Sequence, residues 1–235
     1  MQPALCVALV LALLATEIRA ENWPGWRGRA GTGHTSETKL PLSRDGQTGS
    51  NVRWKVRTGG TGHSTPVVWD YSVFLTTSAP QPVEQKGKIM PEHHVIASRV
   101  SDGKQLWRAS IAPGKSLCRW HEYAAPTPAT DGKALYVWFG SGVAAAVDFE
   151  GNLIWREQRD GVSMASDLLN PADGLLYYVS AGTSVIVRGG PKFVLVAVNN
   201  LGGGDAQCGP SAAVSNGRLF VRDFEFLYCI GQPAH

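Results

Sequence analysis

The chain carries little charge. Only 17% of its 235 residues are Asp, Glu, Lys or Arg, and the formal net charge is +3. The basic residues are scattered, and the cluster Arg27-Gly28-Arg29 is too short to follow a phosphate backbone. We therefore expect no nucleic-acid partner. The 27 Gly and 14 Pro among 43% hydrophobic residues argue against disorder and coiled coils and favour a turn-rich, all-β fold.

Cysteine is scarce, with four residues, and the sequence has neither an adjacent Cys-Cys pair nor a Cys-x-x-Cys-His haem attachment. Cys118 and His121 have a workable metal-ligand spacing, but a structural zinc site needs about four converging ligands. His93 and His94 point to opposite faces of a strand, so at most one of them could join. We predict no metal site.

Three cysteines follow the N-terminal segment. We expect small buried side chains or, as the alternative, one disulfide between the two that share the last repeat. The three are Cys118, Cys208 and Cys229.

The sequence also lacks a hydrophobic run long enough to cross a bilayer, which takes roughly 20 apolar residues. Its longest run covers residues 6–15, and Ile18-Arg19-Ala20 follows with a small residue at a cleavage position. We expect residues 1–20 to be a signal peptide cleaved near Ala20, so the mature chain is periplasmic or secreted and not transmembrane. A membrane anchor and a hydrophobic first strand are the alternatives.

A short phrase of small and β-branched residues recurs along the chain and ends each time in an aromatic residue. The aromatics are Phe74, Tyr136, Tyr178 and Phe220, at spacings of 62, 42 and 42 residues. A period near 40 residues made of short strands and turns is typical of a β-propeller. The strands group into about four units of four strands, near residues 64–110, 124–158, 165–199 and 210–231.

The last unit has only three strands of its own. Residues 51–57, Asn-Val-Arg-Trp-Lys-Val-Arg, alternate like a strand and contain Trp54. This segment could supply the missing strand and close the ring, which would remove an open sheet edge. We thus predict a lead-in at residues 21–50 and a propeller domain at residues 51–232.

Two turns repeat with a tryptophan four residues after a glycine, Gly103 to Trp107 and Gly151 to Trp155. With Trp54, these residues are predicted to wedge between neighbouring sheets. The stretch from Ala97 to Trp107 resembles the tryptophan-docking motif of the PQQ-binding-like (quinoprotein) propellers. The opening Asn-Trp-Pro-Gly-Trp-Arg-Gly at residues 22–28 resembles their extracytoplasmic branch, which includes the outer-membrane assembly propeller.

The resemblance implies seven or eight blades, whereas the sequence accounts for about four. Three interpretations stay open: a compact four-bladed ring, an open or oligomerising half-ring, and a chain with an internal deletion and no function. Enzymes of the family bind PQQ with calcium and carry a vicinal Cys-Cys pair. Because that pair is missing here, we predict no PQQ and no calcium, and we favour a non-enzymatic role. A PQQ-dependent oxidoreductase or a degenerate relative remains the alternative.

Segments that enter the innermost strands of a propeller meet at one mouth of its channel. The candidate binding residues there are His63, Ser64, Trp120, His121, Glu122 and Tyr123. A Ser/His/Glu set suggests hydrolysis, but no Gly-x-Ser-x-Gly nucleophile elbow occurs. We therefore predict a rim that binds a protein partner or a small ligand, whose identity the sequence does not give.

Overall fold

The structure is a computed structural model that describes residues 21–29, 31–81, 84, 89–114, 123–159, 168–169, 174–180, 183–201, 212–215, 218–222 and 226–231. Within these residues fifteen strands form four antiparallel sheets, and there is no α-helix. Consequently, that part of the chain holds no helix able to cross a membrane. The predicted all-β fold of about four sheet units is confirmed.

Three sheets have four strands, each strand pairing with its neighbours in chain order, and the last sheet has three. The first blade holds β1 (Val67–Trp69), β2 (Ser72–Ser78), β3 (His93–Arg99) and β4 (Gln105–Ile111). The second holds β5 (Ala129–Thr130), β6 (Leu135–Trp138), β7 (Val143–Val147) and β8 (Leu153–Gln158). The third holds β9 (Leu168–Leu169), β10 (Leu175–Ser180), β11 (Thr183–Arg188) and β12 (Val194–Asn200). The fourth holds β13 (Ala213–Ser215), β14 (Arg218–Arg222) and β15 (Leu227–Ile230).

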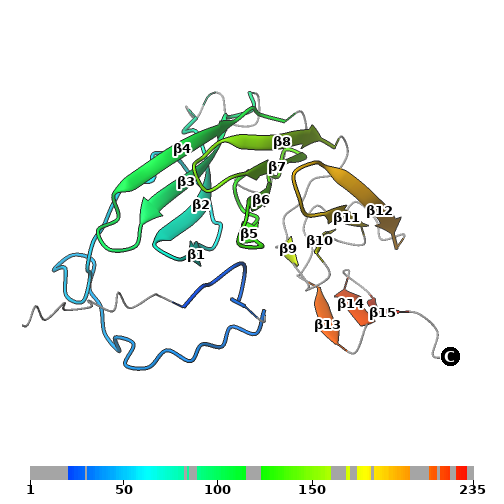
Figure 1. Cartoon of the computed structure of the whole chain (residues 1–235). Coiled ribbons are helices and arrows are strands. Elements are labelled where there is room, and N and C mark those ends of the chain that lie inside the picture. Colours follow the sequence, from blue (N-terminus) through cyan, green and yellow to red (C-terminus); the bar gives the residue numbers. More distant parts are fainter. Residues whose placement is uncertain are drawn as a thin grey trace, which may run out of the picture.

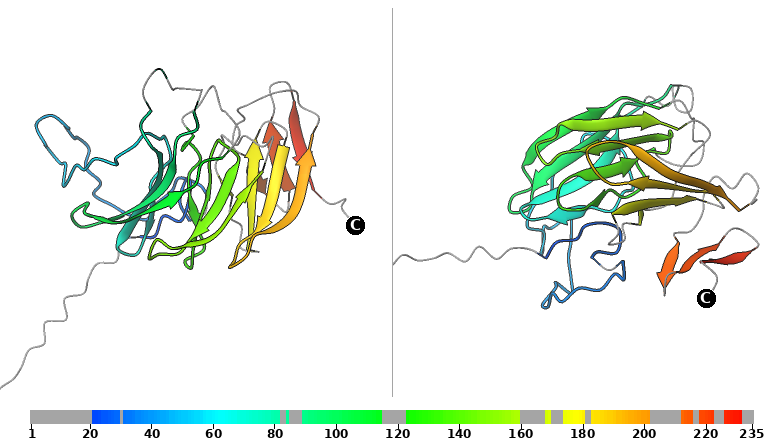
Figure 2. Two further views of the ribbon diagram at one scale, coloured as in Figure 1. Left: turned by 90° about the horizontal axis from the view of Figure 1, so that it is seen from above. Right: turned by 45° about the vertical axis from the view of Figure 1, so that its right-hand side comes forward.

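The four sheets stand side by side in an arc that is open on one side (Figure 1). The first strand of each sheet lies toward the inside of the arc, and β4, β8 and β12 lie outside. The first blade and the last sheet lie at the two ends of this arc (Figure 1), and the view from above shows the first three blades side by side (Figure 2). The propeller is therefore an open ring, which is one of the forms that the sequence left possible.

Neighbouring blades bury each other's faces, and the second blade has a neighbour on both sides. Every residue of β6 and β7 is buried. The three alanines at the centre of β7 let the adjacent sheets approach closely, while large side chains from β6 fill the space on either face. A strand buried on both faces needs no polar side, which explains the continuous apolar sequence of these two strands.

The core is divided between the blade interfaces, and its size falls along the chain. The cluster between the first and second blades has 13 buried members and the one between the second and third has 11. Among the described residues, the cluster at the last sheet has two buried members, Ala212 and Val221, with three partly buried neighbours. Within that part of the chain, the last sheet has the smallest packed cluster.

The lead-in runs along the inner edge of the first two blades. Trp23 exchanges two backbone hydrogen bonds with Val68 of β1, of 2.8 and 3.0 Å. Thr130 of β5 donates its N–H to the Pro24 carbonyl at 2.9 Å. The lead-in therefore connects two blades at their innermost strands.

Residues 51–57 do not complete the last sheet, contrary to the pairing that their alternation suggested. They form no strand, and β15 pairs only with β14 within the described residues. The side chain of Trp54 instead packs against Gly103 of the first blade. The first blade and β15 lie at opposite ends of the arc (Figure 1). Alternation indicates a strand but does not specify which sheet edge it meets.

Candidate functional site

A groove lies beside the first blade, where the chain enters β1. Its volume is about 460 Å³. Polar and small residues dominate its lining: Thr58, Gly60, Thr61, Gly62, His63, Ser64, Pro66, Leu75, Thr76 and Thr77.

Backbone hydrogen bonds fix the wall of this groove. Thr61 pairs with Ser78 at the end of β2, with N···O distances of 2.9 and 2.8 Å. His63 and Ser64 both donate their N–H groups to the Ala124 carbonyl, at 3.1 and 3.2 Å. The segments that enter β1 and β5 therefore meet at this wall.

The wall also requires a glycine. A Cβ at Gly60 would clash with the Thr77 hydroxyl and the Ser78 carbonyl, so only glycine permits this close approach to β2.

The hydroxyl of Ser64 serves the fold. Its Oγ donates to the Thr76 carbonyl at 3.3 Å and accepts from the Thr76 N–H at 3.2 Å. Among the described residues no base forms a hydrogen bond with Ser64 Oγ.

The structure describes three of the six predicted rim residues. His63 is exposed and lines the groove together with the half-buried Ser64. Tyr123 is only 5% exposed, and its ring lies 5.7 Å from that of His93, away from the groove lining. Trp120, His121 and Glu122 lie outside the described residues. The shared rim of all six residues stays a prediction.

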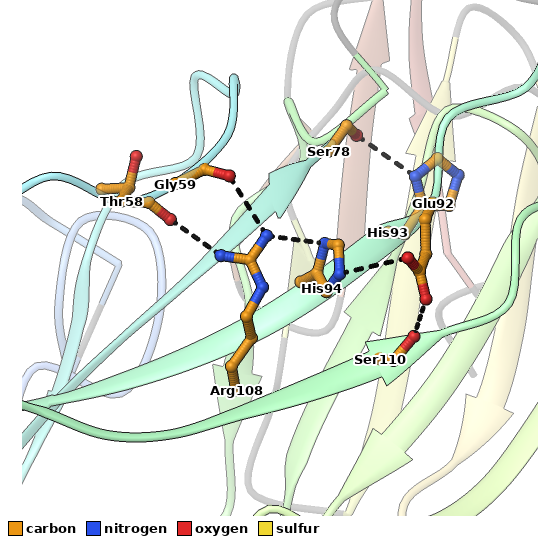
Figure 3. Close-up of polar contacts among 8 residues, drawn as sticks. All are labelled: Thr58, Gly59, Ser78, Glu92, His93, His94, Arg108 and Ser110. Atoms are coloured by element: carbon orange, nitrogen blue, oxygen red, sulfur yellow. Dashed lines mark hydrogen bonds and ion pairs between the residues drawn. The ribbon is translucent and has the colours of Figure 1, made fainter. Parts of the chain in front are cut away.

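A buried histidine network connects the first two blades, and the sequence analysis did not anticipate it. His93 is fully buried on β3. Its Nδ1 lies 3.1 Å from Ser78 Oγ, and its Nε2 lies 2.7 Å from Ser141 Oγ in the β6–β7 turn (Figure 3 shows the Ser78 contact). The ring stacks on Phe139 with centroids 4.4 Å apart. Burial, followed by the charges of His94 and Arg156, lowers the pKa of His93 to about 3, so the ring is neutral.

The neighbouring His94 points to the opposite side of β3 and takes part in a second network (Figure 3). Its Nδ1 lies 3.0 Å from Nη2 of Arg108, and its Nε2 lies 3.6 Å from Glu92. Burial and then the Arg108 charge lower the pKa of His94, while Glu92 opposes that shift. Arg108 also donates to the carbonyls of Thr58 and Gly59, at 3.1 and 3.2 Å. The first blade thus holds the segment that leads into the groove.

The same arginine contact recurs one blade further on. Arg156 follows Trp155 just as Arg108 follows Trp107. It donates to the carbonyls of Ala112 and Pro113, which come just after β4, at 2.9–3.3 Å. Arg156 therefore binds the segment that leaves β4, and Arg108 binds the segment that follows residues 51–57.

Each predicted docking tryptophan lies on a turn of the next blade along the chain. The indole of Trp107 covers Gly151, where a Cβ would lie 2.8 Å from the ring, and donates to the Phe149 carbonyl at 2.7 Å. Trp54 covers Gly103 in the same way and donates to the Val100 carbonyl at 2.9 Å.

The third tryptophan extends this series. Trp155 donates to the Gly190 carbonyl at 3.0 Å and contacts Phe193 edge-on. Sequence reasoning missed Gly190 because its turn lacks the Asp that begins the other two motifs.

One cysteine and the candidate metal ligands can be placed. Cys229 lies on β15 as a free, exposed thiol, so the expected burial of this residue is wrong. The last sheet leaves it exposed because little packs against β15. Cys118, Cys208 and His121 lie outside the described residues. Within the described part, no three His, Cys, Asp or Glu side chains converge on a common point.

Comparison with known proteins identifies the family. The family described as the outer membrane protein assembly factor BamB matches residues 42–207, more than two thirds of the chain. BamB from Moraxella catarrhalis is similar in structure, with a TM-score of 0.49 and 15% identity. That match covers 76% of this chain and 49% of the Moraxella protein, so the chain spans about half of its length. No curated protein matches. The docked tryptophans, the sheet repeat and the sequence match agree, and this chain belongs to the BamB family of PQQ-like β-propellers.

Proposed function

We propose that the chain is an exported, non-enzymatic binding module that holds an extended polypeptide in the groove beside β1. The family is described as an outer membrane protein assembly factor, which supports a polypeptide as the bound species. Export is supported by the apolar run at residues 6–15 and the small residue Ala20.

The observation that carries the proposal is the chemistry of the groove wall. The Ser64 hydroxyl is already hydrogen-bonded to the backbone of Thr76. Ser141 and His93 would be a better pair for nucleophilic catalysis, but both are fully buried. Thr58, Thr61 and His63 are exposed residues of the groove lining, whereas Thr77 is buried and its hydroxyl donates to the Thr61 carbonyl at 3.1 Å. Such a wall offers donors and acceptors to a peptide backbone without an activated nucleophile.

The test uses a fluorescently labelled, unfolded outer-membrane β-barrel protein diluted from urea, titrated with the purified chain. We expect a saturable rise in anisotropy. His63→Glu should weaken binding about tenfold, equivalent to about 1.4 kcal/mol, because it places a charge in the groove. The matched control is His34→Glu, since His34 is exposed in the lead-in and outside the groove. Equal affinities of the two variants, or no binding by the unmodified chain, would overturn the proposal.

Two further measurements test the other parts of the proposal. Mass spectrometry of the protein recovered from an exporting bacterial host should find an N-terminus at Glu21, and an intact Met1 would contradict export. A thermal melt with PQQ and Ca²⁺ should leave the Tm unchanged, since a ligand that binds the folded chain raises it. A clear rise in Tm would favour the oxidoreductase alternative.

A further inference from the structure

Residues 51–59 are bound to the first blade in the same way as an outer strand of a preceding blade. Trp54 covers Gly103 as Trp107 covers Gly151. Arg108 holds the carbonyls of Thr58 and Gly59 as Arg156 holds those just after β4. Both contacts of a docked outer strand are therefore present.

The sheet to which such a strand would belong is not beside it. In the first two blades, the Trp-bearing strand pairs with the third strand of its own sheet, as Ala97 pairs with Trp107 and Ala146 with Trp155. The backbone of residues 53–57 forms no hydrogen bond within the described part of the chain. Val52 and Trp54 are half-buried while Arg53 and Lys55 are exposed, which is the alternation of a strand lying on a neighbouring blade.

The last sheet shows the complementary deficiency. Within the described residues it has three strands, and β15 pairs with β14 alone. Leu227 and Ile230 of β15 are 73% and 39% exposed. An unpaired edge with exposed apolar residues is a template for another strand.

The register of the repeat specifies how the two parts would fit. Phe74 pairs with Ala97, which pairs with Trp107. Tyr136, Ala146 and Trp155 form the same row in the second blade. In the last sheet Phe220 pairs with Cys229, and the row stops there. The missing member of the row is a tryptophan on an outer strand, and Trp54 has that place in the repeat.

These two parts stand at opposite ends of the arc in one chain (Figure 1). We propose that two copies of the chain close a ring together, with residues 51–57 of each copy pairing with β15 of the other and Trp54 opposite Cys229. The arrangement has two-fold symmetry, so both open edges of each copy are satisfied at once. It goes beyond the proposed function, because it concerns the assembly of the chain and not the groove.

Disulfide trapping tests this register. By analogy with Val95 and Ala109 of the first blade, Leu227 should face Val56, and both side chains are exposed in a single copy. In a chain with every native cysteine replaced by serine, one preparation carries Val56→Cys and a second carries Leu227→Cys. On mild oxidation, the mixture should give a reducible band at twice the mass of the 25.2 kDa chain. The control replaces the second preparation with Ser215→Cys, on the far edge of the same sheet, and should give no such band.

Light scattering gives an independent measurement. The unmodified chain should elute as a dimer, and Lys55→Pro should shift it toward the monomer, because proline removes an edge N–H that has no partner within one copy. Far-UV circular dichroism checks that the variant retains its β-structure. A monomer at all concentrations, or equal trapping of the Val56 and Ser215 positions, would overturn the proposal. So would a disulfide formed within one chain that carries both Val56→Cys and Leu227→Cys, since the ring would then close on itself.

Discussion

Replacing Gly151 by alanine tests whether tryptophan docking holds the blades together. Gly151 has φ +92° and lies under the ring of Trp107. A methyl group there meets two separate penalties, one from the backbone and one from the indole.

The free-energy cost of each penalty can be estimated separately. A left-handed conformation costs an L-residue roughly 1–2 kcal/mol. A Cβ only 2.8 Å from the ring forces the indole to move, which breaks its hydrogen bond to the Phe149 carbonyl at a cost of about 1 kcal/mol. Re-exposing roughly 50 Å² of the ring costs about 1 kcal/mol more. We therefore expect Gly151→Ala to lower the free energy of unfolding by about 3–4 kcal/mol.

The matched control is Gly49→Ala. Gly49 has φ +79°, and a Cβ there would have no atom within 4 Å, so this variant meets the backbone penalty alone. The assay is urea unfolding followed by far-UV circular dichroism at one fixed protein concentration. We expect the Gly151 variant to lose about 2 kcal/mol more than the control.

A double-mutant cycle with Trp107→Leu sharpens the test, because the extra cost of Gly151→Ala should largely disappear once the indole is gone. Equal losses in the Gly151 and Gly49 variants would refute the reasoning that this glycine is needed to seat the ring.

Three further predictions follow from buried and bridging polar groups. Burial lowers the pKa of His93 to about 3. Below about pH 6.5 the unfolded chain therefore takes up a proton that the folded chain does not accept until about pH 3. The urea midpoint of unfolding should fall as the pH decreases through this range, and His93→Gln should make the midpoint less dependent on pH. The Tyr178 hydroxyl is buried and has no hydrogen-bond partner among the described residues, whereas the Tyr136 hydroxyl donates to Asp131 at 3.0 Å. In urea unfolding, Tyr178→Phe should therefore be neutral or stabilising and Tyr136→Phe should cost about 1 kcal/mol, and the opposite order would contradict this. Arg108→Met should release residues 58–59 and speed tryptic cleavage after residue 57, measured by timed digestion, and an unchanged rate would show that the two carbonyl contacts do not hold the segment.

The repeat in the sequence predicted the sheets well, because strand period and turn spacing are local properties. Phe74, Tyr136, Tyr178 and Phe220 lie on β2, β6, β10 and β14, each the second strand of its sheet. The longer first spacing arises from two long connections, one between β2 and β3 and one between β4 and β5. The docking tryptophans and the turn glycines could also be predicted from the sequence, since both recur at fixed places in the repeat.

The buried polar contacts between blades could not be predicted from the sequence in the same way. His93 and Ser141 are 48 positions apart, and the alternating strand pattern gives no sign that the histidine is buried. Its burial depends on Phe139 and on the β6–β7 turn of the next blade, which is tertiary information. The strand with which residues 51–57 pair could not be predicted for a related reason. The pairing depends on how the arc closes and not on local strand propensity.

The unequal interfaces also indicate where the fold should open first. In a repeat protein, stability is the sum of each unit and its contacts with its neighbours. The first interfaces have large clusters and docked tryptophans, whereas β12 contains no tryptophan and leaves Val196 and Val198 45% and 50% exposed. A groove of about 580 Å³ lies between the third blade and the last sheet. The last sheet therefore depends most on any strand added to β15, so closure by a second copy would stabilise the chain where a single copy is weakest.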